Sequence, residues 1–195
     1  MARTDPAYLS LTTALHRFYD FTEKEVLYVG AGGGQLLDPG SLTRPWVAVD
    51  QDEVALGALR TRFPSATLLA MPFEQVTRTG DVVYLEFCLH EMRDPEAALR
   101  HARTLAPEVV VFDHAPGSPW CFLGVEEDKV ERSSAAIRRF DVRRREGARL
   151  DRPFRDATEL NAKFAAQGPT AIARLEKYQG ATDLVIPMDY ELNLL

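Results

Sequence analysis

An apolar run that ends in a cluster of glycines constrains the fold more than any other feature of this sequence. Residues 25–29 (EVLYV) lead directly into residues 30–34 (GAGGG), where four of five positions lack a β-carbon. Glycine lets the backbone turn sharply and lets a ligand approach the main chain. A short apolar run stopped in this way predicts a buried parallel strand that leads into a tight binding loop.

The rest of the first 115 residues alternates between apolar runs and helical patterns. Further strands are predicted at 46–50, 66–70, 81–85 and 108–112, and helices at 52–62 and 95–105. A helix is also predicted to begin at Asp5–Pro6, because a capping residue precedes a proline. This alternation predicts an α/β fold: a doubly wound, mostly parallel, Rossmann-like sheet with helices on both faces.

The pattern changes after Asp113. Helices are predicted at 125–140, 157–166 and 169–178, and the weak alternation of 183–195 predicts a final, antiparallel strand. We expect one domain over residues 1–195. It would comprise an N-terminal helix and possible lid (1–22), a nucleotide-binding half (23–115), and a helical insert with the last strand on the acceptor side (116–195).

Composition narrows the functional classes. The net charge of -6 argues against general binding to nucleic acid, which requires neutralisation of phosphates. The two cysteines, Cys88 and Cys121, form no CxxC pair, and no metal site is predicted from residue spacing. The first 20 residues lack the uninterrupted apolar core of a signal peptide, and no run is long enough to cross a bilayer, so a cytoplasmic location is expected.

The glycines and one acid together predict a nucleotide site. Asp50 ends the second predicted strand, twenty positions after Gly30, where a carboxylate accepts hydrogen bonds from ribose hydroxyls. Dinucleotide sites use Gly-x-Gly-x-x-Gly/Ala, but Gln35 occupies the third glycine position here. This spacing favours S-adenosylmethionine, which has no pyrophosphate, over a nicotinamide cofactor. A glycine turn beside a surface acid is the simplest alternative.

An ordered set of motifs resembles the class I S-adenosylmethionine-dependent methyltransferases, nearest to their small-molecule group (methyltransferase-11-like). The set comprises residues 26–34 (VLYVGAGGG), 47–50 (VAVD), 70–73 (AMPF) and 81–92 (DVVYLEFCLHEM), followed by 94–99 (DPEAAL). The resemblance covers roughly residues 20–115. It implies methyl transfer from S-adenosylmethionine to a small-molecule acceptor.

The resemblance also implies which residues contact the cofactor. The glycine loop would line its methionine part, Asp50 and Gln51 its ribose, Ala70 and Met71 its adenine, and Leu85 and Glu86 the methionine part again. The implied set is Tyr28, Gly30, Ala31, Gly32, Gly34, Asp50, Gln51, Ala70, Met71, Leu85 and Glu86.

Two positions depart from the family pattern. Tyr28 stands where the family usually has an acid near the cofactor's ammonium group, and no acid faces the expected adenine position, where Thr67 and Ala70 lie. One hypothesis is that Glu86 replaces the missing acid. The alternative is that Glu86 begins a polar loop.

His90, Asp113 and His114 are the candidate catalytic residues, because they follow the fourth and fifth predicted strands. Methyl transfer needs alignment of the acceptor and, for some acceptors, a general base, for which an imidazole is suited. The alternative for each histidine is a hydrogen-bonded structural role. Glu91 and His90 predict no metal pair, because no second histidine stands at helical distance.

Three further features have two interpretations each. The first predicted helix is either a lid or an amphipathic helix on the sheet edge. Trp120, Cys121 and Phe122 either line an acceptor pocket or pack in the core or at an interface. Eight arginines within residues 138–155 give that window a net charge of +5. They either attract an anionic acceptor or form a solvated face, which is the favoured interpretation. The acceptor, the oligomeric state and a catalytically silent, ligand-binding role stay open.

Overall fold

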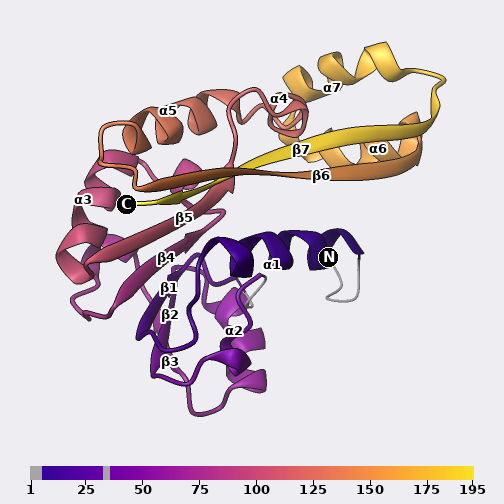
Figure 1. Ribbon diagram of the computed structural model, residues 1–195. Helices are drawn as coiled ribbons and strands as arrows, with labels where there is room; N and C mark the ends of the chain where they lie inside the picture. The colour runs from indigo at the N-terminus through magenta and orange to yellow at the C-terminus, as the bar shows by residue number, and fades with distance from the viewer. Residues whose placement is uncertain (1–5, 33–35) are drawn as a thin grey trace.

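The computed structural model describes residues 6–32 and 36–195, with side chains from residue 9 onward. Gly33, Gly34 and Gln35, to which the loop predictions refer in part, lie outside the described residues. Seven strands form one sheet in the order β3-β2-β1-β4-β5-β7-β6 (Figure 1). The strands are β1 (Val26–Val29), β2 (Trp46–Asp50), β3 (Thr67–Ala70), β4 (Val82–Glu86), β5 (Glu108–His114), β6 (Arg144–Asp156) and β7 (Thr182–Leu194).

The first five strands are parallel and the last two are antiparallel to their neighbours. The predicted Rossmann-like sheet with a C-terminal antiparallel strand is therefore confirmed. Helices cover both faces. They are α1 (Pro6–Phe18), α2 (Glu53–Arg62), α3 (Pro95–Leu105), α4 (Pro119–Leu123), α5 (Glu127–Ile137), α6 (Ala157–Phe164) and α7 (Pro169–Leu175), with single 3-10 turns η1 (Pro39–Ser41), η2 (Phe73–Gln75), η3 (Leu89–Glu91), η4 (Ala165–Gln167) and η5 (Glu176–Tyr178).

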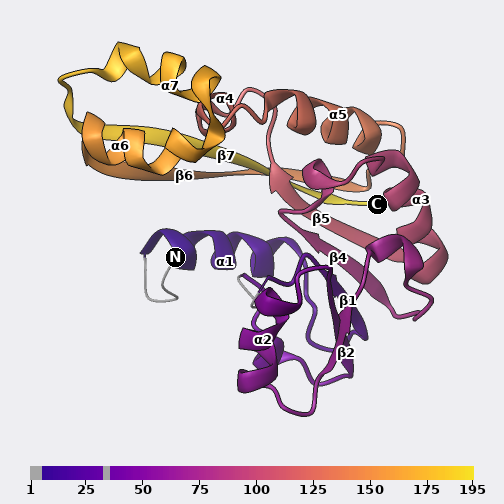
Figure 2. The same cartoon turned by 180° about the vertical axis from the view of Figure 1, so that it is seen from behind.

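Alternating strand residues divide the core into two layers. Tyr28, Tyr84 and Phe112 pack with α1 and α2 on one face, whereas Leu27, Leu85 and Val111 pack with α3 and α5 on the other. Strands covered on both faces are apolar at nearly every position, which is why they were readable as continuous apolar runs. Figures 1 and 2 show the two helical layers from opposite sides.

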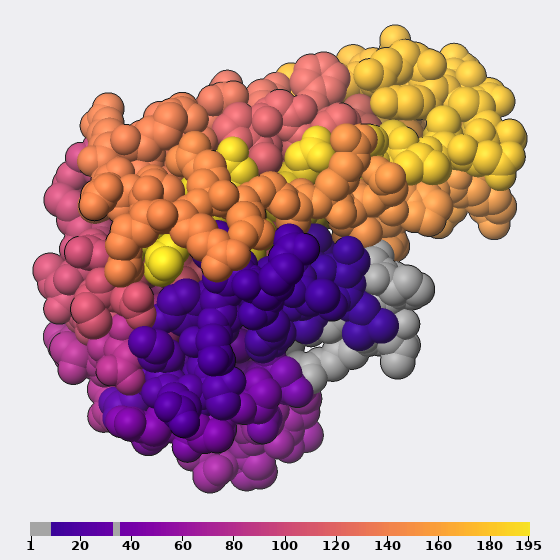
Figure 3. Space-filling model, viewed as in Figure 1, coloured from indigo at the N-terminus to yellow at the C-terminus, as the bar shows by residue number. Residues whose placement is uncertain are grey.

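The β6–β7 hairpin extends far beyond the parallel sheet. Both strands have 13 residues, but β7 pairs with β5 over Val110–His114 alone. The free part of the hairpin carries its own apolar cluster, which includes Leu160 and Phe164 of α6, Leu175 of α7 and Ile186 of β7. Figure 3 shows this part projecting from the body, with the surface of α1 beneath it.

Local capping explains why several helices begin where they do. Asp94 accepts a hydrogen bond from Ala97 N and precedes Pro95, so α3 begins at that proline. Asp52 caps α2 by accepting from the main-chain N–H groups of Val54 and Ala55. Among the described residues, no helix has the length and apolar character needed to traverse a bilayer.

Candidate functional site

A cleft of about 310 Å³ lies at the carboxyl ends of β1 and β2, where open α/β sheets bind ligands. We call it the glycine cleft. Residues from the β1 and β2 ends, η2 and η3 line it: Val29, Gly30, Val49, Asp50, Gln51, Met71, Pro72, Phe73, Glu74, Cys88, Glu91, Met92 and Arg93. Its volume is at the lower end of the range for small-molecule sites.

Gly30 is required by its backbone conformation and by its neighbours. Its φ is +70°, a left-handed value that favours glycine. A β-carbon there would stand 2.7 Å from both Glu86 O and Cys88 Cβ, closer than β-carbons in proteins approach other atoms. The N–H of Gly30 donates to Val49 O at 3.0 Å, which ties the loop to β2. The first loop glycine therefore allows β1, β2 and the segment after β4 to meet.

Asp50 joins the glycine loop to the next helix. Its Oδ2 accepts from Gly32 N at 3.0 Å and its Oδ1 accepts from Asp52 N at 3.0 Å. Each carboxylate oxygen can accept one more bond, and the residue lines the cleft. Glu74 and Glu91 are two further carboxylates in this lining, and Arg93 is its one guanidinium among the described residues. The cleft therefore suits a ligand with positive charge and hydroxyl groups.

Between Gly30 and β2, the described residues contain the single turn η1 and no α-helix. A dinucleotide site places its pyrophosphate at the N-terminus of the helix that follows the glycines. The described part of this loop thus offers no such helix N-terminus.

The structure distributes the predicted cofactor residues between the wall and the support of the cleft. Gly30, Asp50, Gln51 and Met71 line it. Gly32 donates to Asp50, and Ala70 lies exposed at the end of β3, paired in register with Asp50. Four others are buried beneath the wall: Tyr28, Ala31, Leu85 and Glu86. Gly34 lies outside the described residues.

The Glu86 carboxylate is held by protein donors. Leu36 N donates to Oε1 at 3.1 Å, Leu37 N to Oε2 at 3.4 Å, and Tyr84 Oη to Oε2 at 2.9 Å. Burial raises the pKa of Glu86 to about 7, against the lowering effect of these bonds and of one from Tyr28. Glu86 therefore fixes the chain that follows the glycine loop, and its contact with a ligand's ammonium group stays a prediction.

A second pocket of about 370 Å³ lies beside the first, and Glu91 lines both. We call it the histidine pocket. Residues of α1, η3, β5, α4, α6, η4 and β7 and of the loops between them line it: Leu11, Leu36, Phe87, His90, Glu91, His114, Trp120, Gly124, Glu126, Lys163, Phe164, Gln167, Met188 and Tyr190. Of the described residues that line it, Lys163 alone carries a permanent positive charge.

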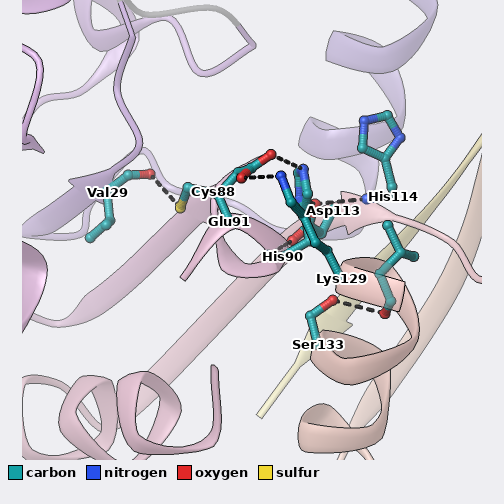
Figure 4. Close-up of polar contacts among 9 residues, drawn as sticks. Val29, Cys88, His90, Glu91, Asp113, His114, Lys129 and Ser133 are labelled. Carbon is teal, nitrogen blue, oxygen red and sulfur yellow. Dashed lines mark hydrogen bonds and ion pairs between the residues drawn. The ribbon is translucent and has the colours of Figure 1, made fainter. Parts of the chain in front are cut away.

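The three predicted catalytic residues meet at the histidine pocket (Figure 4). Asp113 Oδ1 lies 2.5 Å from His90 Nδ1 and accepts from His114 N at 2.8 Å, and Oδ2 accepts from His90 N at 2.9 Å. Because a carboxylate only accepts, it holds the proton of a neutral His90 on Nδ1, so Nε2 carries the lone pair and lies 3.4 Å from Glu91 Oε1. Burial lowers the pKa of His90, but the hydrogen bond and charge of Asp113 outweigh it and raise the pKa overall.

His114 is held by aromatic rings. Its ring stacks on Tyr190 at 4.9 Å and on Phe87 at 5.9 Å, and burial lowers its pKa to about 4, so it is neutral near pH 7. Burial also raises the pKa of Glu126, against a lowering effect of His90. The pocket thus presents two imidazoles and two carboxylates, Glu91 and Glu126, among aromatic walls.

Sequence reasoning missed Phe87, Glu126, Met188 and Tyr190 in the pocket. Phe87 has a φ of +49°, a strained value for a side chain of this size, and such strain is concentrated at functional sites. Tyr190 stands opposite His114 in the β5–β7 register. No local sequence signal reveals these positions, because they depend on strand pairing and on packing between distant segments.

The other residues that the sequence suggested for an acceptor pocket are divided between the pocket, the core and the surface. Trp120 lines the histidine pocket, whereas Cys121 is buried and Phe122 is 43% exposed beneath Arg174. In α1, Leu15 and Phe18 are buried in the core and Leu11 reaches the histidine pocket. This helix therefore packs against the sheet and also lines the pocket. Tyr8 of this helix has no described side chain.

Residues 144–155 of the arginine-rich window lie in β6, a strand that sequence analysis did not predict. Three of these arginines pair with acids close to them in the sequence. Arg144 pairs with Glu146, Arg149 with Asp151 and Arg155 with Asp156, and Arg145 donates to Asn193. These contacts agree with the favoured interpretation of a solvated face.

No family model and no curated protein matches this sequence. Solved structures do resemble the fold. A putative methyltransferase, BH2331 from Bacillus halodurans, aligns with a TM-score of 0.65 at 13% identity over 95% of this chain and 96% of that one. The YcgJ protein of Bacillus subtilis gives 0.62 at 13% over 96% of both chains. Magnesium protoporphyrin IX methyltransferase ChlM from Synechocystis, with bound S-adenosylmethionine, gives 0.54 at 14% over 95% and 77%. The chain therefore has the class I methyltransferase fold.

Proposed function

We propose that this chain is an S-adenosylmethionine-dependent methyltransferase that acts on a small-molecule acceptor. Residues 23–115 would bind the donor in the glycine cleft, and residues 116–195 would build most of the acceptor site. The observation that carries the proposal is the glycine cleft itself. A close main-chain approach at Gly30, the Asp50 carboxylate and two further carboxylates lie together at the carboxyl ends of the strands.

The charge of the cleft favours this donor over a dinucleotide. S-adenosylmethionine carries a sulfonium and an ammonium group, whereas a dinucleotide carries an anionic pyrophosphate. Three carboxylates and one guanidinium line the cleft, and no α-helix follows Gly30 among the described residues of its loop. Asp50 would accept bonds from ribose hydroxyls, and Met71 and Phe73 would contact the adenine. The similarity to ChlM, solved with S-adenosylmethionine, adds support from the fold.

The bound donor would supply an activated methyl group with a good leaving group. The protein's part is then to align the acceptor and keep water out. Aromatic side chains of Phe87, Trp120 and Tyr190 shape the histidine pocket. His90, Asp113 and His114 would activate the acceptor, with Asp113 holding the other two. Glu91, which lines both cavities, marks the boundary across which transfer would occur.

Calorimetry with three ligands tests the donor assignment: S-adenosylmethionine, its demethylated product S-adenosylhomocysteine, and NAD⁺. We expect binding of the first two and none of NAD⁺. Asp50→Asn should weaken binding of the product at least tenfold, because bonds to a charged acceptor contribute about 1.5–3 kcal/mol. Asp52→Asn is the matched control, since asparagine also caps helices and should leave the affinity unchanged.

Binding of NAD⁺ alone would identify a dinucleotide protein, and no binding of any of the three would remove the enzyme assignment. A screen of small-molecule acceptors with radiolabelled donor then tests turnover. Donor binding without transfer to any acceptor would favour a ligand-binding protein with the same fold.

A further inference from the structure

Three potential metal ligands converge in the histidine pocket from three separate elements. His90 lies in η3, His114 ends β5, and Glu126 directly precedes α5. One nitrogen of each imidazole and one carboxylate oxygen lie within 4.8 Å of one another. All three residues line the pocket, so a bound ion would be reachable from the acceptor side.

The ligand set has a definite chemical preference. Imidazole nitrogen binds divalent transition ions, whereas Mg²⁺ and Ca²⁺ prefer oxygen. Ligand atoms bonded to one zinc-type ion at about 2.0–2.2 Å stand roughly 3–3.5 Å apart. Atoms already within 4.8 Å reach this spacing by small side-chain rotations, for which the long side chain of Glu126 is suited. Two imidazoles and one carboxylate leave further coordination positions open.

Asp113 prepares the two histidines for such an ion. Its Oδ1 lies within hydrogen-bond distance of His90 Nδ1, which directs the Nε2 atom of His90 away from Asp113. It also accepts from the main-chain N–H groups of both His90 and His114. Histidines that bind metal commonly donate their other nitrogen to a carboxylate in this manner, which fixes the ring and strengthens the ligand. One buried side chain thus positions both imidazoles.

His114 supplies an independent observation. Its Nδ1 is buried and has no hydrogen-bond partner among the described residues. Buried polar atoms are nearly always paired, so an unpaired one calls for an explanation. The stacking of the ring on Phe87 and Tyr190 fixes its plane. An unsatisfied imidazole beside a second imidazole and a carboxylate points to a ligand that the three share.

The charged groups around the pocket favour binding of a cation. Glu91 Oε1 lies 3.4 Å from His90 Nε2, and its other oxygen pairs with Lys129 at 2.7 Å. Lys163, which lines the pocket, lies over the ring of Trp120 at 5.5 Å. The carboxylates of Glu91 and Glu126 are therefore only partly balanced by positive groups of the pocket.

We infer that His90, His114 and Glu126 bind one divalent transition cation, of the Zn²⁺ or Mn²⁺ type, in the histidine pocket. Its open positions would hold an oxygen atom of the acceptor. The cation site stands on the cluster alone, whereas the role toward an acceptor rests on the proposed function. Sequence analysis predicted no metal site, because it considered local spacing alone and His114 lies 24 residues beyond His90.

Calorimetry on chelator-treated protein tests the site without donor or acceptor. We expect one Zn²⁺ or Mn²⁺ per chain, a rise in Tm on binding, and at least hundredfold weaker binding of Mg²⁺. Glu126→Gln and His114→Gln should each weaken Zn²⁺ at least tenfold. The exposed residues Glu131 and His16 give the matched controls, Glu131→Gln and His16→Gln, which should leave affinity unchanged. Binding that survives both pocket variants, or no binding, overturns the site.

Absorption of Co²⁺-loaded wild-type protein keeps the site testable if a variant fails to fold. Intense visible bands of low-coordinate Co²⁺ with nitrogen ligands support it, and a hexaaquo-like spectrum overturns it. Acetohydroxamate, a bidentate oxygen donor, should shift these bands if open positions face the pocket. An unchanged spectrum overturns the role of the cation toward an acceptor but does not contradict the cation site itself. Product calorimetry is independent, so failure of the donor assignment is seen separately.

Discussion

The glycine cleft and the histidine pocket adjoin each other but are built by different means. The cleft uses the ends of short parallel strands, and its key contacts involve the main chain at Gly30 and Gly32. The pocket uses residues from seven elements, including α1 near one end of the chain and β7 near the other. The first is set by local geometry and the second by packing between distant segments.

The two regions also rest on different parts of the core. The cleft stands on the parallel strands packed between α2 and α3, whereas the far wall of the pocket belongs to the hairpin cluster with α6 and α7. Under the proposed function, this division would let the acceptor site vary while the donor site stays the same. We therefore expect variants of one region to leave ligand binding in the other intact.

The largest effect is expected for Gly30→Ala. The new β-carbon would meet a backbone oxygen at 2.7 Å, in a left-handed conformation. We expect unfolding free energy to fall by about 4 kcal/mol, from the sum of strain and overpacking, and binding of S-adenosylhomocysteine to be lost. Urea denaturation and calorimetry measure the two effects.

Gly180→Ala is the matched control for strain. Gly180 has a φ of +78°, but nothing lies within 4 Å of a β-carbon placed there. It should cost about 1–2 kcal/mol and leave the product affinity unchanged. Equal losses in the two variants would mean that close approach at Gly30 contributes nothing to the cleft.

The next effect concerns the pH dependence of stability at Glu86, which anchors the chain between the two regions. Its carboxylate accepts from Leu36 N, and Leu36 lines the histidine pocket. With a folded pKa of about 7, raised by burial, the folded state binds this proton more tightly than the unfolded state. The associated stability is full below the ordinary pKa near 4.5 and is lost as pH rises past about 7.

Urea denaturation between pH 4 and pH 8 should therefore show this loss in the wild-type protein and not in Glu86→Gln. The difference between the two profiles should reach about 3 kcal/mol. Glu23→Gln, at an exposed position, should keep the wild-type profile. If Glu86→Gln also keeps it, the carboxylate does not titrate in this range and the loop is fixed by other contacts.

The sequence predicted the elements that depend on local signals and missed those that depend on pairing between distant segments. The helix α3 was predicted at its observed bounds because Asp94 and Pro95 mark its start locally. Strand β6 was missed because it pairs with β7 alone, at the sheet edge, and most of its side chains are not buried. Without a buried face, a strand has no apolar alternation to read.

The site residues show the same difference between local signals and distant pairing. Gly30 and Asp50 were identified because glycines and an acid after two successive strands form a local signature. His90, Asp113 and His114 were named singly, as polar residues after strands, but their mutual contact required the β4–β5 pairing. Glu126 and Tyr190 come from a loop and an antiparallel strand that no nearby motif places beside them.

A smaller effect is expected for Asp113→Asn, which tests whether the two regions are independent. Asp113 is 2% exposed and accepts from two main-chain N–H groups and from His90. The amide offers one acceptor oxygen, so a buried N–H loses its partner at a cost of about 2 kcal/mol. The product affinity should stay within twofold. Asp141→Asn, at an exposed position, controls for the loss of charge.

A tenfold fall in product affinity with Asp113→Asn would contradict the division. It would mean that the buried network around the histidines holds the glycine cleft open, and that one cooperative unit carries both regions. Unfolding followed by two probes, tryptophan fluorescence and far-UV circular dichroism, shows whether destabilisation stays two-state.

The smallest effect is expected for Arg149→Gln on β6. The side chain is 59% exposed and pairs with Asp151 at 3.1 Å, and such surface pairs contribute under about 1 kcal/mol. Stability should change by less than about 0.5 kcal/mol and product affinity not at all. An acceptor-dependent rise in KM with this variant would instead assign the arginine-rich face to recognition of an anion. Because salt screens exposed charges, that rise should then be reproduced in the wild-type protein by increasing ionic strength.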